Sequence, residues 1–191
     1  MTPFELLVLV VSKLDSLGIP YMIGGSFASS AHGIPRSTQD ADIVIDIQPE
    51  QAPNFVRAFI EGFFIDEEQV KQAVSAKRSF NVIHLETMFK VDFFVLGTSR
   101  YAREAFSRRW PAALEAAAPM MVATAEDTVL AKLDWYRLGG GVSDRQWRDI
   151  TGVLKTQAER LDTEYLRKWA AELGVSDLLE RAQTEAGTSP L

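Results

Sequence analysis

The chain has 191 residues, of which 47% are hydrophobic and 24% charged, and its formal net charge is −6. This length and composition are typical of one globular domain, or one domain with a small appendage, with enough apolar residues for a core. The acidic balance argues against non-specific coating of nucleic acid, which depends on clustered Lys and Arg, but it still allows a local basic groove. The absence of cysteine excludes disulfides and thiolate metal sites and fits a reducing, cytoplasmic compartment.

The N-terminal segment predicts a buried amphipathic helix. Thr2 can cap it, Pro3 suits its first position and Glu5 completes a capping box, while Gly18 stops it. The apolar run at residues 6–11 is too short to span a membrane, and no basic stretch precedes it. We therefore expect neither a signal peptide nor a membrane partner.

The next segments predict a strand, a turn and a helix, followed by a second strand. "YMI" at residues 21–23 is a short strand that leads into two glycines, and residues 26–32 form a short helix that Gly33 ends. "DADIVIDI" at residues 40–47 is β-branched and alternates, as a strand does, and Pro49 opens a helix through about residue 61.

The remainder predicts further strands and then helices only. We expect a short strand at 63–66, a helix at 67–76, a hairpin of 79–86 with 89–97, a helix at 100–109 and an ambiguous, extended segment at 112–124. Four helices follow, at 126–139, 144–157, 163–174 and 176–186. The predicted fold class is α+β: a small mixed-sheet core (1–123) with flanking helices and a C-terminal helical region (124–191) that packs on it.

Two carboxylates are predicted to share one face of the strand at residues 40–47. Asp40 and Asp42 are two residues apart, so they project side by side, and they repel each other unless a cation lies between them. Mg²⁺, with Mn²⁺ as the alternative, is the natural cation because it prefers oxygen ligands. Asp92, in a second apolar strand, supplies a third acid, and three acids on one sheet face indicate a phosphoryl-transfer site. Asp46 shares their parity but lies at the far end of the strand, so we leave it out.

A glycine turn precedes these acids. Gly24 and Gly25 allow a close backbone approach and positive φ, and a helix that begins at Ser26 points its free N–H groups at an anion in the turn. Strand, turn and helix start together predict a phosphate cradle. An isolated Asp-x-Asp is usually a strand end or loop and an isolated Gly-Gly a simple turn, so the indication comes from their combination.

The ordered motifs resemble a known superfamily. "GGS", thirteen residues and then "DAD" within "STQDADIVID" resemble the signature of the polymerase-β-like nucleotidyltransferases, and Asp92 falls where that superfamily has its third acid. Residues 122–154 look like the helical region of small bacterial nucleotidyltransferases related to abortive-infection toxins. The positions that match are Lys132, Arg145, Arg148, Asp149 and Ile150. The resemblance covers about residues 20–155.

The resemblance implies transfer of a nucleoside monophosphate from an NTP to an acceptor hydroxyl, with release of pyrophosphate. Asp40 and Asp42 would hold Mg²⁺, and Asp92 would bind or activate the acceptor. The remaining residues would bind the triphosphate, with a backbone cradle and two cations: Gly24, Gly25, Ser26, Arg36 and Lys132. For either cation the alternative is a solvated surface position.

Several functional alternatives stay open. The acceptor is a tRNA end, a protein side chain or a small molecule such as an aminoglycoside, and a toxin role with an antitoxin partner follows from the resemblance alone. A nucleotide-binding or regulatory module that has lost turnover is the second hypothesis, and a structural partner that docks through the apolar tail is the third. The sequence leaves the base preference, the oligomeric state and the parts of His32 and Asp149 undecided.

Other conspicuous side chains favour structural roles. Trp135, Trp147 and Trp169 lie at helical spacing with Leu and Ile, which predicts core packing over base stacking. His84 alternates with apolar neighbours in a predicted strand, and His32, beside Gly33, suits local capping at a helix end.

Overall fold

The structure, a computed structural model, describes residues 1–113 and 119–188. The chain divides into two compact units: residues 1–24 with 37–122 form unit 1, and residues 25–36 with 123–191 form unit 2. The expected domains, 1–123 and 124–191, differ from these units mainly in where they place residues 25–36.

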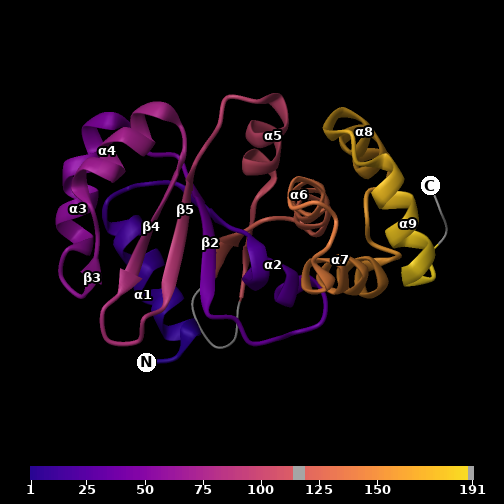
Figure 1. The fold of residues 1–191 in the computed structure, drawn as a ribbon, viewed down its shortest axis with the longest axis horizontal. Coiled ribbons are helices and arrows are strands. Elements are labelled where there is room, and N and C mark those ends of the chain that lie inside the picture. The colour runs from indigo at the N-terminus through magenta and orange to yellow at the C-terminus, as the bar shows by residue number, and fades with distance from the viewer. Residues whose placement is uncertain (114–118, 189–191) are drawn as a thin grey trace. The chain divides into compact units, whose positions relative to one another are not determined.

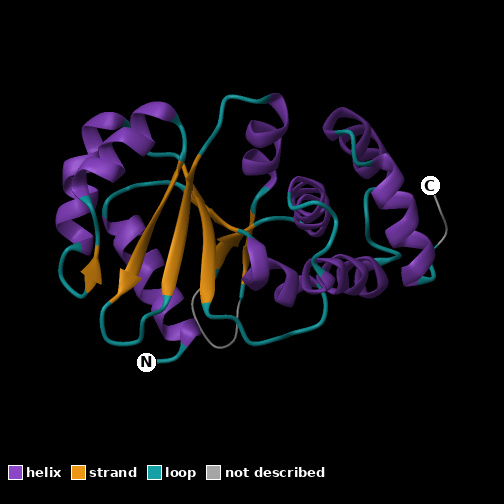
Figure 2. Ribbon diagram, in the orientation of Figure 1, coloured by secondary structure: helices purple, strands orange, loops and turns teal. Residues whose placement is uncertain are grey.

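Unit 1 is built on a mixed sheet (Figure 2). Its described part has seven strands in the order β3-β4-β5-β2-β1-β7-β6, with β2 parallel to β5, β1 parallel to β7 and the other neighbours antiparallel. The mixed sheet with its helices confirms the predicted fold class. The strands are β1 Tyr21–Ile23, β2 Asp40–Ile45, β3 Phe63–Phe64, β4 Ser79–His84, β5 Lys90–Val95, β6 Trp110–Ala112 and β7 Met120–Val122.

The helices of unit 1 begin where the sequence predicts. Thr2 and Glu5 form the expected capping box of α1, and the Asp66 side chain caps α4. The helix expected at 49–61 is divided into a 3-10 turn, η1, and the α-helix α3. The bounds are α1 Pro3–Ser16, η1 Pro49–Gln51, α3 Ala52–Phe59, α4 Glu67–Ala76 and α5 Arg100–Arg108.

The central strands of this sheet present two different faces. Burial alternates strictly along β2 and β5, so every second side chain is buried and the others are partly exposed. The buried face packs on an aromatic cluster in which Phe55 stacks on Phe59, with ring centroids 4.5 Å apart, and meets Phe93 edge-on at 5.2 Å. The opposite, half-exposed face has polar side chains at the first half of each strand and one apolar side chain further along, Val44 on β2 and Phe94 on β5.

Unit 2 is helical (Figure 1). Its helices are α2 Gly25–His32, α6 Ala125–Leu138, α7 Asp144–Gln157, α8 Thr163–Leu173 and α9 Ser176–Ala186, so the four predicted C-terminal helices form and α2 joins them. Thr124 and Ser143 cap α6 and α7, as the sequence predicts. Trp147 and Trp169 are buried as expected, but the prediction for Trp135 is wrong, because 53% of its side-chain surface is exposed.

The ambiguous segment at 112–124 is extended where it is described. It begins at the end of β6 and includes β7, while residues 114–118 lie outside the described residues. The predicted fraying of the C-terminus concerns residues 189–191, which also lie outside the described residues. None of the described helices combines the length and the apolarity that crossing a membrane needs.

Candidate functional site

Three predicted acids lie on neighbouring strands of unit 1 and share one face. In the parallel pair of β2 and β5, Asp40 is opposite Lys90 and Asp42 is opposite Asp92. All four side chains are on the half-exposed face of the sheet, because residues two apart in a strand point the same way. Asp46 lies beyond the end of β2, where its carboxylate accepts a 3.2 Å hydrogen bond from Gln48 Nε2.

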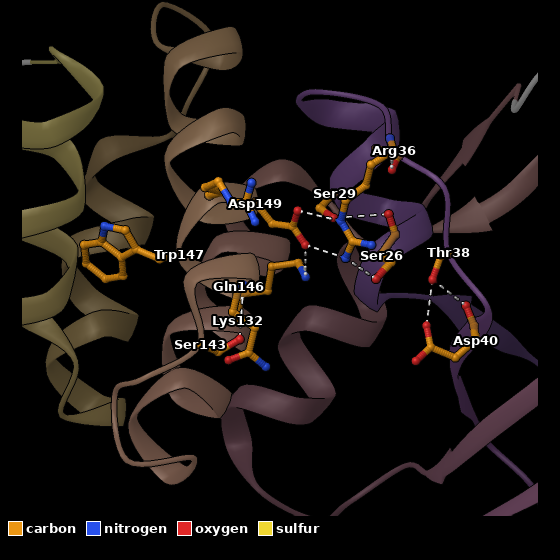
Figure 3. Close-up of polar contacts among 12 residues, drawn as sticks. Ser26, Ser29, Arg36, Thr38, Asp40, Lys132, Ser143, Gln146, Trp147 and Asp149 are labelled. Atoms are coloured by element: carbon orange, nitrogen blue, oxygen red, sulfur yellow. Dashed lines mark hydrogen bonds and ion pairs between the residues drawn. The ribbon is translucent and has the colours of Figure 1, made fainter.

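Two neighbouring side chains hold these carboxylates. Thr38 Oγ1 donates to Asp40 Oδ1 at 2.6 Å (Figure 3), and Lys90 Nζ is 2.7 Å from Asp92 Oδ2. The hydrogen bond to Asp92 raises the pKa of the Lys90 ammonium, which partial burial opposes, and the charges of Asp92, Asp40 and Asp42 raise it further. Lys90 is not among the site residues predicted from the sequence, although it lies two residues before Asp92 and so has the parity of the acid.

The chemistry of this face fits a hard divalent cation. Asp40 and Asp42 offer carboxylate oxygens on a face that solvent reaches, and Mg²⁺ is usually held by one or two carboxylates together with substrate phosphates. Among the described residues, no group of three or more His, Asp or Glu side chains is arranged to hold a metal by itself. The pair of acids is therefore the part of a magnesium site that the protein would supply.

The two glycines of the turn differ in conformation. The Gly24 N–H donates to the carbonyl oxygen of Asp42 at 2.9 Å, which ties the end of β1 to β2. Positive φ occurs at Gly25, at +53°, but not at Gly24, so the expectation of positive φ is wrong for the first glycine. Gly25 opens α2, one residue before the predicted start at Ser26.

The predicted anion-binding side chains meet in unit 2 around a carboxylate (Figure 3). Arg36 donates from Nε and Nη2 to the two oxygens of Asp149, both at 2.9 Å, and Lys132 Nζ lies 2.9 Å from Asp149 Oδ2. Arg36 Nη2 also donates to the hydroxyl of Ser26, in the first turn of α2, at 2.6 Å. The structure thus brings Ser26, Arg36 and Lys132 together.

Asp149 is the charged centre of this group. Only 6% of its side chain is exposed, and burial acts to raise the pKa of its carboxyl, but hydrogen bonds from Arg36 and Lys132 outweigh burial and leave that pKa below its ordinary value. Asp149 thus holds two cationic groups beside the N-terminus of α2, where an anion is favoured. The sequence left Asp149 undecided because its partners lie on other elements, 17 and 113 residues away.

Both histidines make structural contacts. The His32 ring nitrogen Nε2 is 2.7 Å from the carbonyl oxygen of Ala123, a tertiary contact where the sequence predicted a local one. His84 is buried in β4, as expected, and its Nδ1 is 2.9 Å from the hydroxyl of Thr87.

The fold matches solved structures, although no protein-family model matches the chain and no curated protein matches its sequence. ANT(2'')-Ia, crystallised in complex with adenylyl-2''-tobramycin, superposes with a TM-score of 0.61 at 15% identity over 89% of this chain and 95% of that chain. An antigenic nucleotidyltransferase-like protein from Paracoccidioides brasiliensis gives a TM-score of 0.56 at 17% identity, over 97% of this chain and 93% of that chain.

The chain has a nucleotidyltransferase-like fold. A solution structure of ANT(2'')-Ia, described as an antibiotic-resistance factor, agrees, with a TM-score of 0.52 at 15% identity over 95% of this chain and 96% of that chain. At these identities the likeness concerns the fold alone. The activity, the acceptor and the branch related to abortive-infection toxins remain predictions.

Proposed function

We propose that the protein is a Mg²⁺-dependent nucleotidyltransferase that moves a nucleoside monophosphate from an NTP to an acceptor hydroxyl. The observation that carries this proposal is the register of β2 and β5, which places Asp42 opposite Asp92, with Asp40 on the same half-exposed face. Three carboxylates on one half-exposed sheet face suit phosphoryl transfer, whose catalysis consists mainly of positioning and charge stabilisation.

The three acids have two proposed roles, metal binding and proton acceptance. Asp40 and Asp42 would hold Mg²⁺, or Mn²⁺, which when bound supplies positive charge to the triphosphate and the departing pyrophosphate. Thr38 fixes the Asp40 carboxylate through its 2.6 Å hydrogen bond. Asp92 accepts the proton of the acceptor hydroxyl while the hydroxyl oxygen bonds to the α-phosphorus. The bond from that phosphorus to the bridging oxygen breaks, and its electron pair leaves with pyrophosphate.

The group around Asp149 is our candidate for the β- and γ-phosphates. Arg36 and Lys132 supply two cationic groups, and the first turn of α2 adds the N–H groups of a helix N-terminus and the Ser26 hydroxyl. Gly24 and Gly25 would let the backbone approach the same phosphates.

Small aminoglycoside-like polyols are the first candidate acceptors. The reason is that ANT(2'')-Ia, which was solved with adenylyl-2''-tobramycin, matches most of this chain. A tRNA end and a protein side chain follow. A toxin role rests on the resemblance of residues 122–154, and growth arrest on induced expression that an Asp42→Asn change relieves would support it and justify a search for an antitoxin partner.

Radiolabel transfer tests the activity. Protein is incubated with each of the four α-³²P-NTPs, Mg²⁺, and small-molecule, RNA and protein fractions of a cell extract. We expect label in one fraction and a loss of about 1,000-fold in Asp42→Asn, because that change removes one of the two metal-binding carboxylates. Asp46→Asn is the matched control, since it makes the same change beyond the end of β2, and transfer stays within about threefold. No transfer from any NTP to any fraction would contradict the proposal.

A catalytically silent nucleotide-binding module is the second candidate. It is favoured by the ion pairs that occupy the predicted site residues, since Asp149 holds both Arg36 and Lys132, and Lys90 holds Asp92. Such a module would bind an NTP in a Mg²⁺-dependent manner that Asp40→Ala abolishes, and it would transfer no label.

A further inference from the structure

A lysine is built into the cluster of acids on β2 and β5. Lys90 is opposite Asp40 in the register and two residues before Asp92, so its side chain emerges from the same face as the three carboxylates. Its ammonium is 2.7 Å from Asp92 Oδ2, and the charges of Asp40 and Asp42 also act on it. The Lys90 ammonium therefore lies among the three carboxylates of this face.

This ammonium conflicts with both proposed duties of the acids. The Lys90 ammonium takes up one acceptor site of the Asp92 oxygen that it contacts, so it competes with an acceptor hydroxyl for that carboxylate. A divalent ion held by Asp40 and Asp42 would be repelled by the Lys90 ammonium, whose charge interacts with both acids, and this repulsion disfavours its binding. In the absence of substrate, however, the same ammonium relieves the mutual repulsion of the carboxylates.

We propose that Lys90 is the resident counter-ion of the acid cluster, which occupies Asp92 and weakens divalent-metal binding until a nucleotide brings its own negative charge. Lys90 is then a positioning residue that couples metal binding to nucleotide binding. This inference rests on the proposed function, because it takes Asp40 and Asp42 to be metal ligands.

The side chain of Lys90 is suited to a reversible role. It is 45% exposed, whereas Asp92 is 21% exposed, so the ammonium is close to solvent and can move without unpacking the sheet. Its four-carbon stem is flexible, and the hydrogen bond to Asp92 raises the pKa of the ammonium, which favours the charged form. A triphosphate offers an alternative partner for the ammonium when it leaves Asp92.

Affinity for Mn²⁺, measured by electron paramagnetic resonance on nucleotide-free protein, tests the inference without an activity assay. We expect Lys90→Met to bind Mn²⁺ about tenfold more tightly than the wild type, because a like charge near the ion has been removed. Lys90→Arg, which keeps the charge, should remain within about twofold of the wild type. Addition of a non-hydrolysable NTP should reduce the difference between Lys90→Met and wild type, because the nucleotide supplies compensating charge.

Two further variants separate the possible failures. Lys71→Met makes the same charge change on α4, where Lys71 pairs with Glu67, and should leave Mn²⁺ affinity unchanged. If Asp42→Asn weakens Mn²⁺ binding but Lys90→Met does not strengthen it, the Lys90 inference fails and the metal site stands. If Asp42→Asn has no effect, the proposed function fails and the inference with it. Lys90→Gln replaces Lys90→Met should the latter not fold, as judged by circular dichroism.

Discussion

Asp149 holds the cations Arg36 and Lys132 at 2.9 Å in the interior of unit 2, with 6% of its own side chain exposed. Removing one partner of a buried ion pair leaves the other charge desolvated and without compensation. Asp149→Asn should therefore lower the free energy of unfolding at pH 7 by about 3 kcal/mol, measured by urea denaturation. Asp177→Asn, which breaks an exposed pair with Arg137, is the control and should change the urea midpoint little. Equal losses in the two variants would show that burial of the Asp149 pair does not matter.

The stabilisation by Asp149 should also depend on pH. Its pKa is lower in the folded protein than in an unfolded chain, so the folded state favours the carboxylate and holds fewer protons. The contribution is complete above the ordinary carboxyl pKa of about 3.9 and is lost as the pH falls through the lower, folded value. The gap between the urea midpoints of wild type and Asp149→Asn should be constant from pH 7 to about pH 5 and should narrow below about pH 4. A gap that is the same at about pH 3 as at pH 7 would contradict the assignment.

Among the elements, α2 and α7 make a contact that depends on a glycine. A Cβ added at Gly33 would lie 2.9 Å from Val153 N and 3.0 Å from Ser29 O, both backbone atoms that cannot move aside. Gly33 does not have positive φ, so its role is this close approach and not a left-handed helix cap. We expect Gly33→Ala to destabilise the protein by about 2 kcal/mol in urea unfolding, as overpacking does.

Gly97→Ala is the matched control for that contact. The nearest atom to its added Cβ would be the Ala102 Cβ at 3.9 Å, an ordinary contact, and its φ is not positive. This variant should stay within about 0.5 kcal/mol of the wild type. If both variants have the urea midpoint of the wild type, α2 and α7 can move apart to accept the added Cβ, and the prediction for Gly33 is wrong.

The elements also show which parts of the site the sequence could predict. The shared face of Asp40 and Asp42 follows from strand parity, and helix starts such as that of α6 follow from a capping residue. The pairing of Asp42 with Asp92 needs the register between strands 50 residues apart, which no local pattern encodes, so the sequence predicted the third acid but not its position opposite Asp42. The prediction that Trp135 packs in the core was wrong for a similar reason, because helical spacing defines a face but not whether another element covers it.

The contacts of Asp149 could not be predicted from the sequence either. Its partners are Arg36, in the segment after α2, and Lys132, on α6, so the group exists only once elements distant in sequence have packed. Lys90 differs, since its parity with Asp92 was visible in the sequence. A lysine in a half-exposed strand usually only faces solvent, so this parity alone does not indicate a functional role.

For the molecule as a whole, charge sets the conditions for substrate binding. The net charge of −6 disfavours the approach of a triphosphate at long range, so binding must come from local groups and from a divalent cation that neutralises part of the ligand. The proposed local groups are distributed over the chain: the acids belong to unit 1, whereas Ser26, Arg36 and Lys132 belong to unit 2. A ligand that binds the folded state at any of them stabilises it against unfolding.

The thermal midpoint therefore reports binding even before an acceptor is known. A non-hydrolysable NTP with Mg²⁺, at about 100 times its dissociation constant, should stabilise the protein by about 2.7 kcal/mol and raise the midpoint by about 5 to 10 °C. The increase should be much smaller in EDTA and in Asp42→Asn, because both remove the cation, and it should persist in Asp46→Asn. An equal increase in Asp42→Asn and the wild type would place the nucleotide away from the acids on β2. No increase with any of the four bases would contradict nucleotide binding itself.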